Sequence, residues 1–160
     1  MDPRTLPAAA QELYQNIREE YQVGFEPLQL GDTRLNLLTV SDLESMLDGK
    51  EALSNVSDFP FWVKLWEAAI VLGQYLGGQN FKKGTSLLEL GAGLGVPGLA
   101  AAAAGCDVTL SDYEELILDF ERVSAAASKL DNVDCMMLDW KNPPEMRRYD
   151  IIAVSYTHLT

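Results

Sequence analysis

A glycine-rich segment carries the clearest chemical signal in this sequence. Residues 86–90 form a dense apolar run interrupted by one carboxylate, which is typical of a parallel strand covered on both faces. Four glycines follow within eight residues, where a backbone without Cβ can adopt positive φ and approach a ligand: Gly91, Gly93, Gly95 and Gly98. Pro97 is then tolerated in a first helical turn. The segment predicts a strand, a turn and a helix that hold a nucleotide or nucleoside cofactor.

The spacing alone leaves the cofactor open. Residues 93–98 match G-x-G-x-x-G, and Asp112 lies 19 residues after Gly93, at the end of the next expected strand. This is the arrangement of a dinucleotide site that binds NAD. The same geometry serves any adenosine cofactor, because a carboxylate there can accept both ribose hydroxyls.

Three further features favour a cofactor that carries an amino acid. Glu89 lies within the strand, where an unpartnered carboxylate costs on the order of several kcal/mol. The turn at residues 91–93 is early and tight, which leaves room for an amino-acid moiety instead of a pyrophosphate. Asp139 and Trp140 follow the third strand and offer an acceptor for an adenine amino group and an aromatic plane beside it.

Alternating strands and helices must position these residues. The pattern predicts strands at 86–90, 107–110, 133–138 and 149–154, with helices at 96–104 and 114–129 between the first three. This order implies an α/β fold: a partial Rossmann-like parallel sheet, strand order 3-2-1-4, with helices on both faces. The cofactor is expected across the carboxyl ends of the first two strands.

The chain before the sheet reads as an extension and a linking helix. We expect a helix at 7–21, a hairpin at 25–30 and 34–40, and a short helix opened by the capping box of residues 41–44 and ending near Gly49. A polar loop at 50–58 precedes an apolar helix at 59–76. We divide the chain into an N-terminal helix-hairpin extension at 1–58, a cofactor-binding core at 59–154 and a tail at 155–160.

Composition excludes several function classes. The 160 residues carry 12 basic and 24 acidic side chains, a net charge of −12, which disfavours nucleic acid and membrane surfaces and favours a basic protein partner. No apolar run is long enough to span a membrane, and the N-terminus lacks the pattern of a secretory signal. The two cysteines, Cys106 and Cys135, suit reduced thiols in the cytoplasm, and with a single histidine they disfavour a metal site.

The motifs together resemble a known family. The runs LLELGAGLGVPGL, VTLSDY, LDW and YDII are similar to class I, seven-β-strand S-adenosylmethionine-dependent methyltransferases. The segment FWVKLWEAA before the sheet resembles the family-16 protein-lysine methyltransferases, a group that includes predicted nicotinamide N-methylases. The resemblance covers residues 25–154. It implies methyl transfer from S-adenosyl-L-methionine to a nitrogen, most often of a protein lysine, with a small-molecule amine as the other acceptor class.

The resemblance also implies roles for individual residues. Trp66 would close over the cofactor, Glu89 would hold its ammonium side, and Asp112 would bind the ribose hydroxyls. The full set of implied cofactor-binding residues is Trp66, Glu89, Gly91, Ala92, Gly93, Asp112, Asp139, Trp140 and Ser155. No catalytic residue is assigned.

The end of the chain departs from the family pattern. Members carry S-D-x-x-Y after the fourth strand, whereas here Tyr156 stands in the acidic place and Leu159 in the tyrosine place. Only four of the seven strands are predicted. We interpret 155–160 as a non-native or truncated tail and the chain as a cofactor-binding portion, with a non-catalytic fragment and an NAD-dependent oxidoreductase as the alternatives.

Simpler structural explanations exist for most of these residues. Trp66 could be core packing, since it lies on an apolar helix, and Trp140, beside a strand end, could equally pack there or border an adenine. Asp112 could cap the following helix, and Asp139 could stabilise a turn. Glu89 has no such explanation, because packing alone would select Val or Ile there.

Overall fold

The computed structural model describes residues 1–43 and 60–155. The expected short helix from residue 41 to Gly49 lies almost wholly outside the described residues, as do the polar loop at 50–58 and all of the tail after Ser155. The helices are η1 (Pro3–Thr5), α1 (Ala8–Glu20), η3 (Phe61–Val63), α3 (Glu67–Gly77), α4 (Val96–Ala103) and α5 (Glu115–Ala127). The strands are β1 (Val23–Leu30), β2 (Thr33–Val40), β3 (Ser86–Leu90), β4 (Asp107–Asp112), β5 (Val133–Met137) and β6 (Ile151–Ala153).

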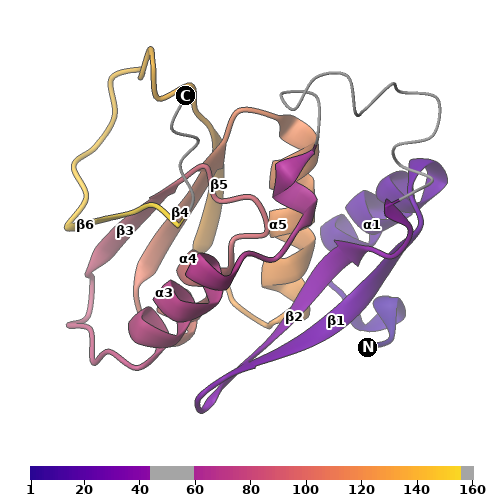
Figure 1. Ribbon diagram of the computed structural model, residues 1–160, viewed down its shortest axis with the longest axis horizontal. Coiled ribbons are helices and arrows are strands. Elements are labelled where there is room, and N and C mark those ends of the chain that lie inside the picture. Colours follow the sequence, from indigo (N-terminus) through magenta and orange to yellow (C-terminus); the bar gives the residue numbers. More distant parts are fainter. Residues whose placement is uncertain (44–59, 156–160) are drawn as a thin grey trace.

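Strands β3 to β6 form one parallel sheet in the order β5-β4-β3-β6 (Figure 1). This confirms the expected α/β class and the predicted order 3-2-1-4. In register, Glu89 of β3 pairs with Leu110 of β4, and Leu110 pairs with Cys135 of β5. These three side chains therefore point to the same face of the sheet.

The described helices cover only that face. A Cβ placed on Gly98 of α4 would lie 2.3 Å from Leu110, and a Cβ on Gly95 would contact both Leu110 and Glu121 of α5. Helix α3 packs beside α4, with Gly73 against Val96. The expectation of helices on both faces is therefore not met in the described residues. The connection at 138–150, where a helix would cross the second face, holds Pro143 and Pro144 in succession and forms no helix.

Loop 138–150 lies against the second face instead. The hydroxyl of Tyr149 donates to Thr109 Oγ1 at 3.1 Å, and the Arg147 guanidinium stacks 4.6 Å from the Tyr149 ring centroid. Ile152 of β6 remains 62% exposed on the same side as Thr109. This face is therefore only partly covered by the chain that the structure describes.

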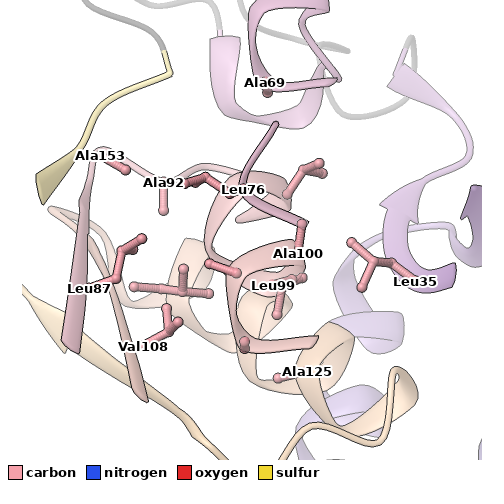
Figure 2. Packing of buried hydrophobic residues seen from close by; sticks show 14 of the residues in the cluster. Leu35, Ala69, Leu76, Leu87, Ala92, Leu99, Ala100, Val108, Ala125 and Ala153 are labelled. Atoms are coloured by element: carbon pink, nitrogen blue, oxygen red, sulfur yellow. The ribbon is translucent and has the colours of Figure 1, made fainter. Parts of the chain in front are cut away.

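The main core fills the space between the sheet and its helices. Figure 2 shows Leu87 and Val108 of the central strands facing Leu99 of α4, with Leu35 of the hairpin approaching from the other side of that helix. The small residues of α4, Ala100 among them, are buried and allow the helices to approach closely. Burial of this alanine-rich helix positions the glycine loop that precedes it.

The N-terminal extension joins the core through α5. Helix α5 lies between the sheet and the antiparallel hairpin β1–β2, with α1 beside it (Figure 1). The amide of Leu38 donates to Ser124 Oγ, and that of Asn36 donates to Ser128 Oγ, both at 2.9 Å. Tyr14 of α1 stacks on Phe25 of β1 with centroids 5.5 Å apart. The hairpin and helix expected at residues 7–40 are thus confirmed.

The expected helix at 59–76 is interrupted. A short turn of 3-10 helix, η3, ends at Val63, and Lys64 and Trp66 have extended backbones before α3 begins at Glu67. The break is stabilised locally, because the Trp66 indole N–H donates to the Phe61 carbonyl at 3.0 Å. None of the helices in residues 1–43 and 60–155 is long and apolar enough to cross a membrane.

Candidate cofactor site

The glycine loop at residues 91–95 follows β3 and is tied to the end of β4. The amide of Gly93 donates to Asp112 Oδ2 at 3.0 Å, and the amide of Ala92 donates to the Ser111 carbonyl at 3.0 Å. Gly93 has a φ of 58°, a left-handed conformation that turns its N–H toward the neighbouring strand. Gly91 and Gly95 are left-handed too, with φ of 60° and 69°. The loop is a cradle of main chain with no Cβ at three of its five positions.

Asp112 lies at the carboxyl end of β4, directly beside this loop. Its Oδ1 accepts the Tyr113 amide at 2.8 Å while its Oδ2 accepts that of Gly93. Burial raises the pKa of this carboxyl, and the two backbone hydrogen bonds oppose that shift. Each oxygen keeps a second lone pair, so the carboxylate can still accept from a pair of ligand hydroxyls.

Glu89 is fully buried beneath the first turn of α4. Its Oε2 accepts the Gly98 amide at 2.7 Å, and its Oε1 accepts the Ser155 hydroxyl at 3.4 Å. Burial raises the pKa of Glu89 to about 8, despite these two bonds. The structure thus brings Glu89 and Ser155 together at the carboxyl ends of β3 and β6.

Trp140 reaches from the end of β5 to the glycine loop. A Cβ placed on Gly91 would lie 3.5 Å from its indole ring, which is 42% exposed. Because β4 lies between β3 and β5, the Trp140 side chain crosses the carboxyl end of β4, where Asp112 lies. Neighbouring Asp139 is exposed, and its Oδ1 accepts the Lys141 amide at 2.9 Å in a turn.

Two tryptophans precede α3, and Trp62 lies closer to the glycine loop than Trp66, the one predicted to contact the cofactor. Trp66 packs near Phe61, and the Lys64 ammonium lies 4.6 Å from the Trp66 ring centroid. Trp62 lies closer to the loop: a Cβ on Gly93 would be 3.6 Å from the Trp62 main chain, and its ring packs edge-on against Phe120. Trp62 was not predicted as a site residue, because an aromatic residue beside Phe61 and Trp66 is typical of a hydrophobic core. Its place in the FWVKLW segment is the one sequence signal that could have indicated a role in the site.

The arrangement fits an adenosine cofactor with an amino-acid end. A main-chain cradle at 91–93 can lie against a ligand without side-chain interference, and Asp112 beside it supplies hydroxyl acceptors. Trp140 supplies an aromatic plane on the Asp112 side. These features lie at the carboxyl ends of adjacent parallel strands, where α/β sheets bind ligands.

A parallel sheet with this loop and carboxylate defines a Rossmann-like cofactor-binding protein. A family model described as "Lysine methyltransferase" matches residues 53–157, more than half of the chain. The chain belongs to this family, a class I S-adenosylmethionine-dependent methyltransferase family.

Curated relatives agree with this assignment. Protein N-lysine methyltransferase METTL21A of Xenopus tropicalis is 35% identical over 94 residues, covering 55% of this chain and 43% of the relative. Histone-arginine methyltransferase METTL23 of Rattus norvegicus is 40% identical over 79 residues, covering 48% and 35%. A histidine protein methyltransferase 1 homolog of Dictyostelium discoideum is 31% identical over 123 residues, covering 72% and 39%. The chain spans less than half the length of each of these relatives.

Proposed function

We propose that this chain forms the S-adenosylmethionine site of a protein N-methyltransferase. The proposed cofactor-binding residues are those expected from sequence: Trp66, Glu89, Gly91, Ala92, Gly93, Asp112, Asp139, Trp140 and Ser155. Trp62 joins them because its main chain borders Gly93. The single observation that carries the proposal is the bond from the Gly93 amide to the Asp112 carboxylate, which joins the loop to a hydroxyl acceptor in one rigid unit.

Each part of the site has a separate task in this proposal. The cradle at 91–93 receives the methionine portion, Asp112 accepts the ribose hydroxyls, and Trp140 borders the adenine. S-Adenosylmethionine, when bound, supplies a methyl group on a positively charged sulfur, which is already activated for displacement. The chain therefore contributes orientation and exclusion of water rather than acid–base chemistry.

The proposed acceptor is a lysine side chain of a protein. Relatives act by name on lysine, arginine and histidine, all nitrogen nucleophiles, and the family description favours lysine. A lysine amine has an ordinary pKa of about 10.4 and must lose its proton before it attacks. The net charge of −12 supports a basic protein as acceptor, and the free thiols Cys106 and Cys135 support a reducing compartment such as the cytoplasm.

Titration calorimetry with S-adenosylhomocysteine tests the cofactor assignment. We expect binding by the 160-residue chain, and a loss of affinity of about tenfold or more in Asp112→Ala because the ribose hydroxyls lose their acceptor. Asp107→Ala is the matched control, since this exposed carboxylate lies at the opposite end of the same strand. Binding of NAD with none of S-adenosylhomocysteine would overturn the proposal.

A methyl-transfer assay tests the acceptor. Radiolabelled S-adenosylmethionine is incubated with cell lysate and either this chain or the full-length protein, and the labelled proteins are hydrolysed to amino acids. We expect label in methyllysine from the full-length protein. Label in methylarginine or methylhistidine instead would keep the cofactor assignment and reject lysine. Transfer by the 160-residue chain alone would show that it is no inert fragment.

A further inference from the structure

Glu121 is a buried carboxyl that the proposed function does not use. It lies in the middle of α5 and is 0% exposed, and in the described residues the only donor near its oxygens is the weak thiol of Cys135 on β5. Isolated buried carboxylates cost many kcal/mol, and the group avoids this by keeping its proton. An apolar residue would fill the same space without that cost, so a reason for the carboxyl is needed.

The position of Glu121 supplies that reason. A Cβ placed on Gly95 would lie 2.9 Å from Leu110 and 3.6 Å from Glu121 Cγ, so the side chain lies against the last residue of the glycine loop. The same loop bonds to Asp112 through Gly93. Any change in the volume or hydration of Glu121 would therefore be transmitted to the Gly93–Asp112 unit.

Groups on four elements influence the ionisation of Glu121: two oppose it and two favour it. Burial is the largest cause that raises its pKa well above the ordinary value, followed by the carboxylates of Asp112 on β4 and Glu89 on β3. The thiol of Cys135 on β5 and the guanidinium of Arg122 on α5 oppose the shift. Arg122 is occupied by its ion pairs with Glu115 and Asp119 on the surface of the helix. Burial and the two acidic neighbours thus favour the protonated form of Glu121.

We propose that Glu121 is a positioning residue of the cofactor site, whose buried side chain supports the glycine loop at Gly95 and thereby keeps Gly93 on Asp112. When Glu121 loses its proton, a second charge forms beneath Gly95 and must gain water, which separates α5 from the loop and displaces Gly93 from Asp112. Ionisation of Glu121 as the pH rises therefore weakens cofactor binding. This inference rests on the proposed cofactor site.

The first test needs no cofactor. Amide chemical shifts of Gly93 and Gly95 are followed by NMR from about pH 6 to about pH 10 in the wild-type chain, Glu121→Gln and Glu121→Leu. Glu89 titrates near pH 8 in all of these chains. We expect both amides of the wild type to show a further transition beyond the one that Glu89 causes, and this further transition to be absent from both variants. Glu115→Gln removes one charge from the exposed surface of α5 and is expected to titrate as the wild type does. Equal titration in Glu121→Gln and wild type would overturn the inference, and Glu121→Leu decides it if the Gln variant does not fold.

The second test is the affinity for S-adenosylhomocysteine over the same pH range. The Glu89 carboxyl and the ligand ammonium change the Kd with pH in both proteins, so the measured quantity is the ratio of the wild-type Kd to the Kd of Glu121→Gln. This ratio is expected to rise about fivefold or more toward alkaline pH. A merely structural role would lower affinity equally at every pH. A parallel alkaline loss in wild type and Glu121→Gln would overturn the inference while leaving the cofactor site intact. Absence of binding at every pH would contradict the proposed function, and the cofactor-free titration would still decide whether Glu121 supports the loop.

Discussion

The carboxyl of Glu89 lies where β3 meets the first turn of α4, and it accepts the Gly98 amide there. That bond satisfies one of the free N–H groups at a helix start. A neutral side chain with a carbonyl oxygen could make the same bond, so the charge itself has no structural use in the cofactor-free chain. We propose that the charge is used only when the ammonium group of the cofactor is near.

Glu89 should make stability depend on pH. Its pKa is about 8 in the folded chain against about 4.5 when unfolded, so the folded state keeps a proton that the unfolded state releases. The resulting stability is complete below about pH 4.5 and is lost as the pH rises through about 8. In Glu89→Gln, the fall in unfolding free energy between about pH 5 and pH 8 should be smaller by on the order of 2–4 kcal/mol.

Urea unfolding at the two pH values measures this effect. Asp134→Asn, an exposed carboxylate on β5, is the control and should leave the wild-type slope unchanged. Glu121 contributes a slope of the same sign, so Glu89→Gln should retain part of the dependence. A variant with the full wild-type slope would show that Glu89 is ionised in the folded chain.

At the scale of elements, α5 connects the N-terminal hairpin to the cofactor core. The edge of β2 that faces away from β1 pairs with no other strand in the described residues. The Leu38 amide on this edge donates instead to the buried hydroxyl of Ser124. The edge of β2 is thereby covered by a helix, which removes a surface for unwanted strand pairing.

Loss of the Ser124 hydroxyl should destabilise the chain measurably. In Ser124→Ala the buried Leu38 amide loses its partner, and we expect a loss of about 1–3 kcal/mol in unfolding free energy. Ser128→Ala removes the equivalent bond to Asn36 at a half-buried position, where water can replace it, and should cost less. Equal losses in the two variants, measured by thermal or urea unfolding, would contradict this account.

Helices and strands with a clear hydrophobic periodicity could be predicted from the sequence. Features that depend on tertiary contacts could not. The amphipathic stripe of Tyr14 and Ile17 and the apolar run before Gly91 identified α1 and β3 directly. The break before Glu67 depends on an indole bond to a carbonyl five residues earlier, which no periodicity signals. The second face of the sheet differs, because Pro143 and Pro144 already indicate in the sequence that no helix precedes the fourth strand.

The residues of the candidate site also fall into those that the sequence predicts and those that only the tertiary structure reveals. Gly93 and Asp112 were found from spacing, because the end of one strand and the start of the next helix have a fixed relation in a parallel sheet. Glu121 and Trp62 were not found, since a Glu within an amphipathic helix reads as a solvated side chain and Trp62 as core. Their positions beside Gly95 and Gly93 appear only when the helices are packed.

At the scale of the whole molecule, the excess of 12 negative charges should govern encounter with a basic acceptor. We expect the Kd of this chain for a basic protein to rise about threefold or more between about 50 and 300 mM salt. The Kd for S-adenosylhomocysteine is the internal control and should change little. A Kd for the basic protein that is independent of salt would argue for recognition by apolar contacts.

The bond between Leu38 and Ser124 also sets an order of events during synthesis. Its two partners are separated by 86 residues of sequence, and the hairpin also packs on Phe120 and Val123 of the same helix. The hairpin therefore leaves the ribosome long before its covering helix exists, and its apolar face waits exposed until α5 has emerged. A nascent chain whose residues 115–128 are still inside the ribosome should leave this hairpin uncovered by α5 and accessible to chaperones, whereas a chain long enough for residue 128 to have emerged can bury it.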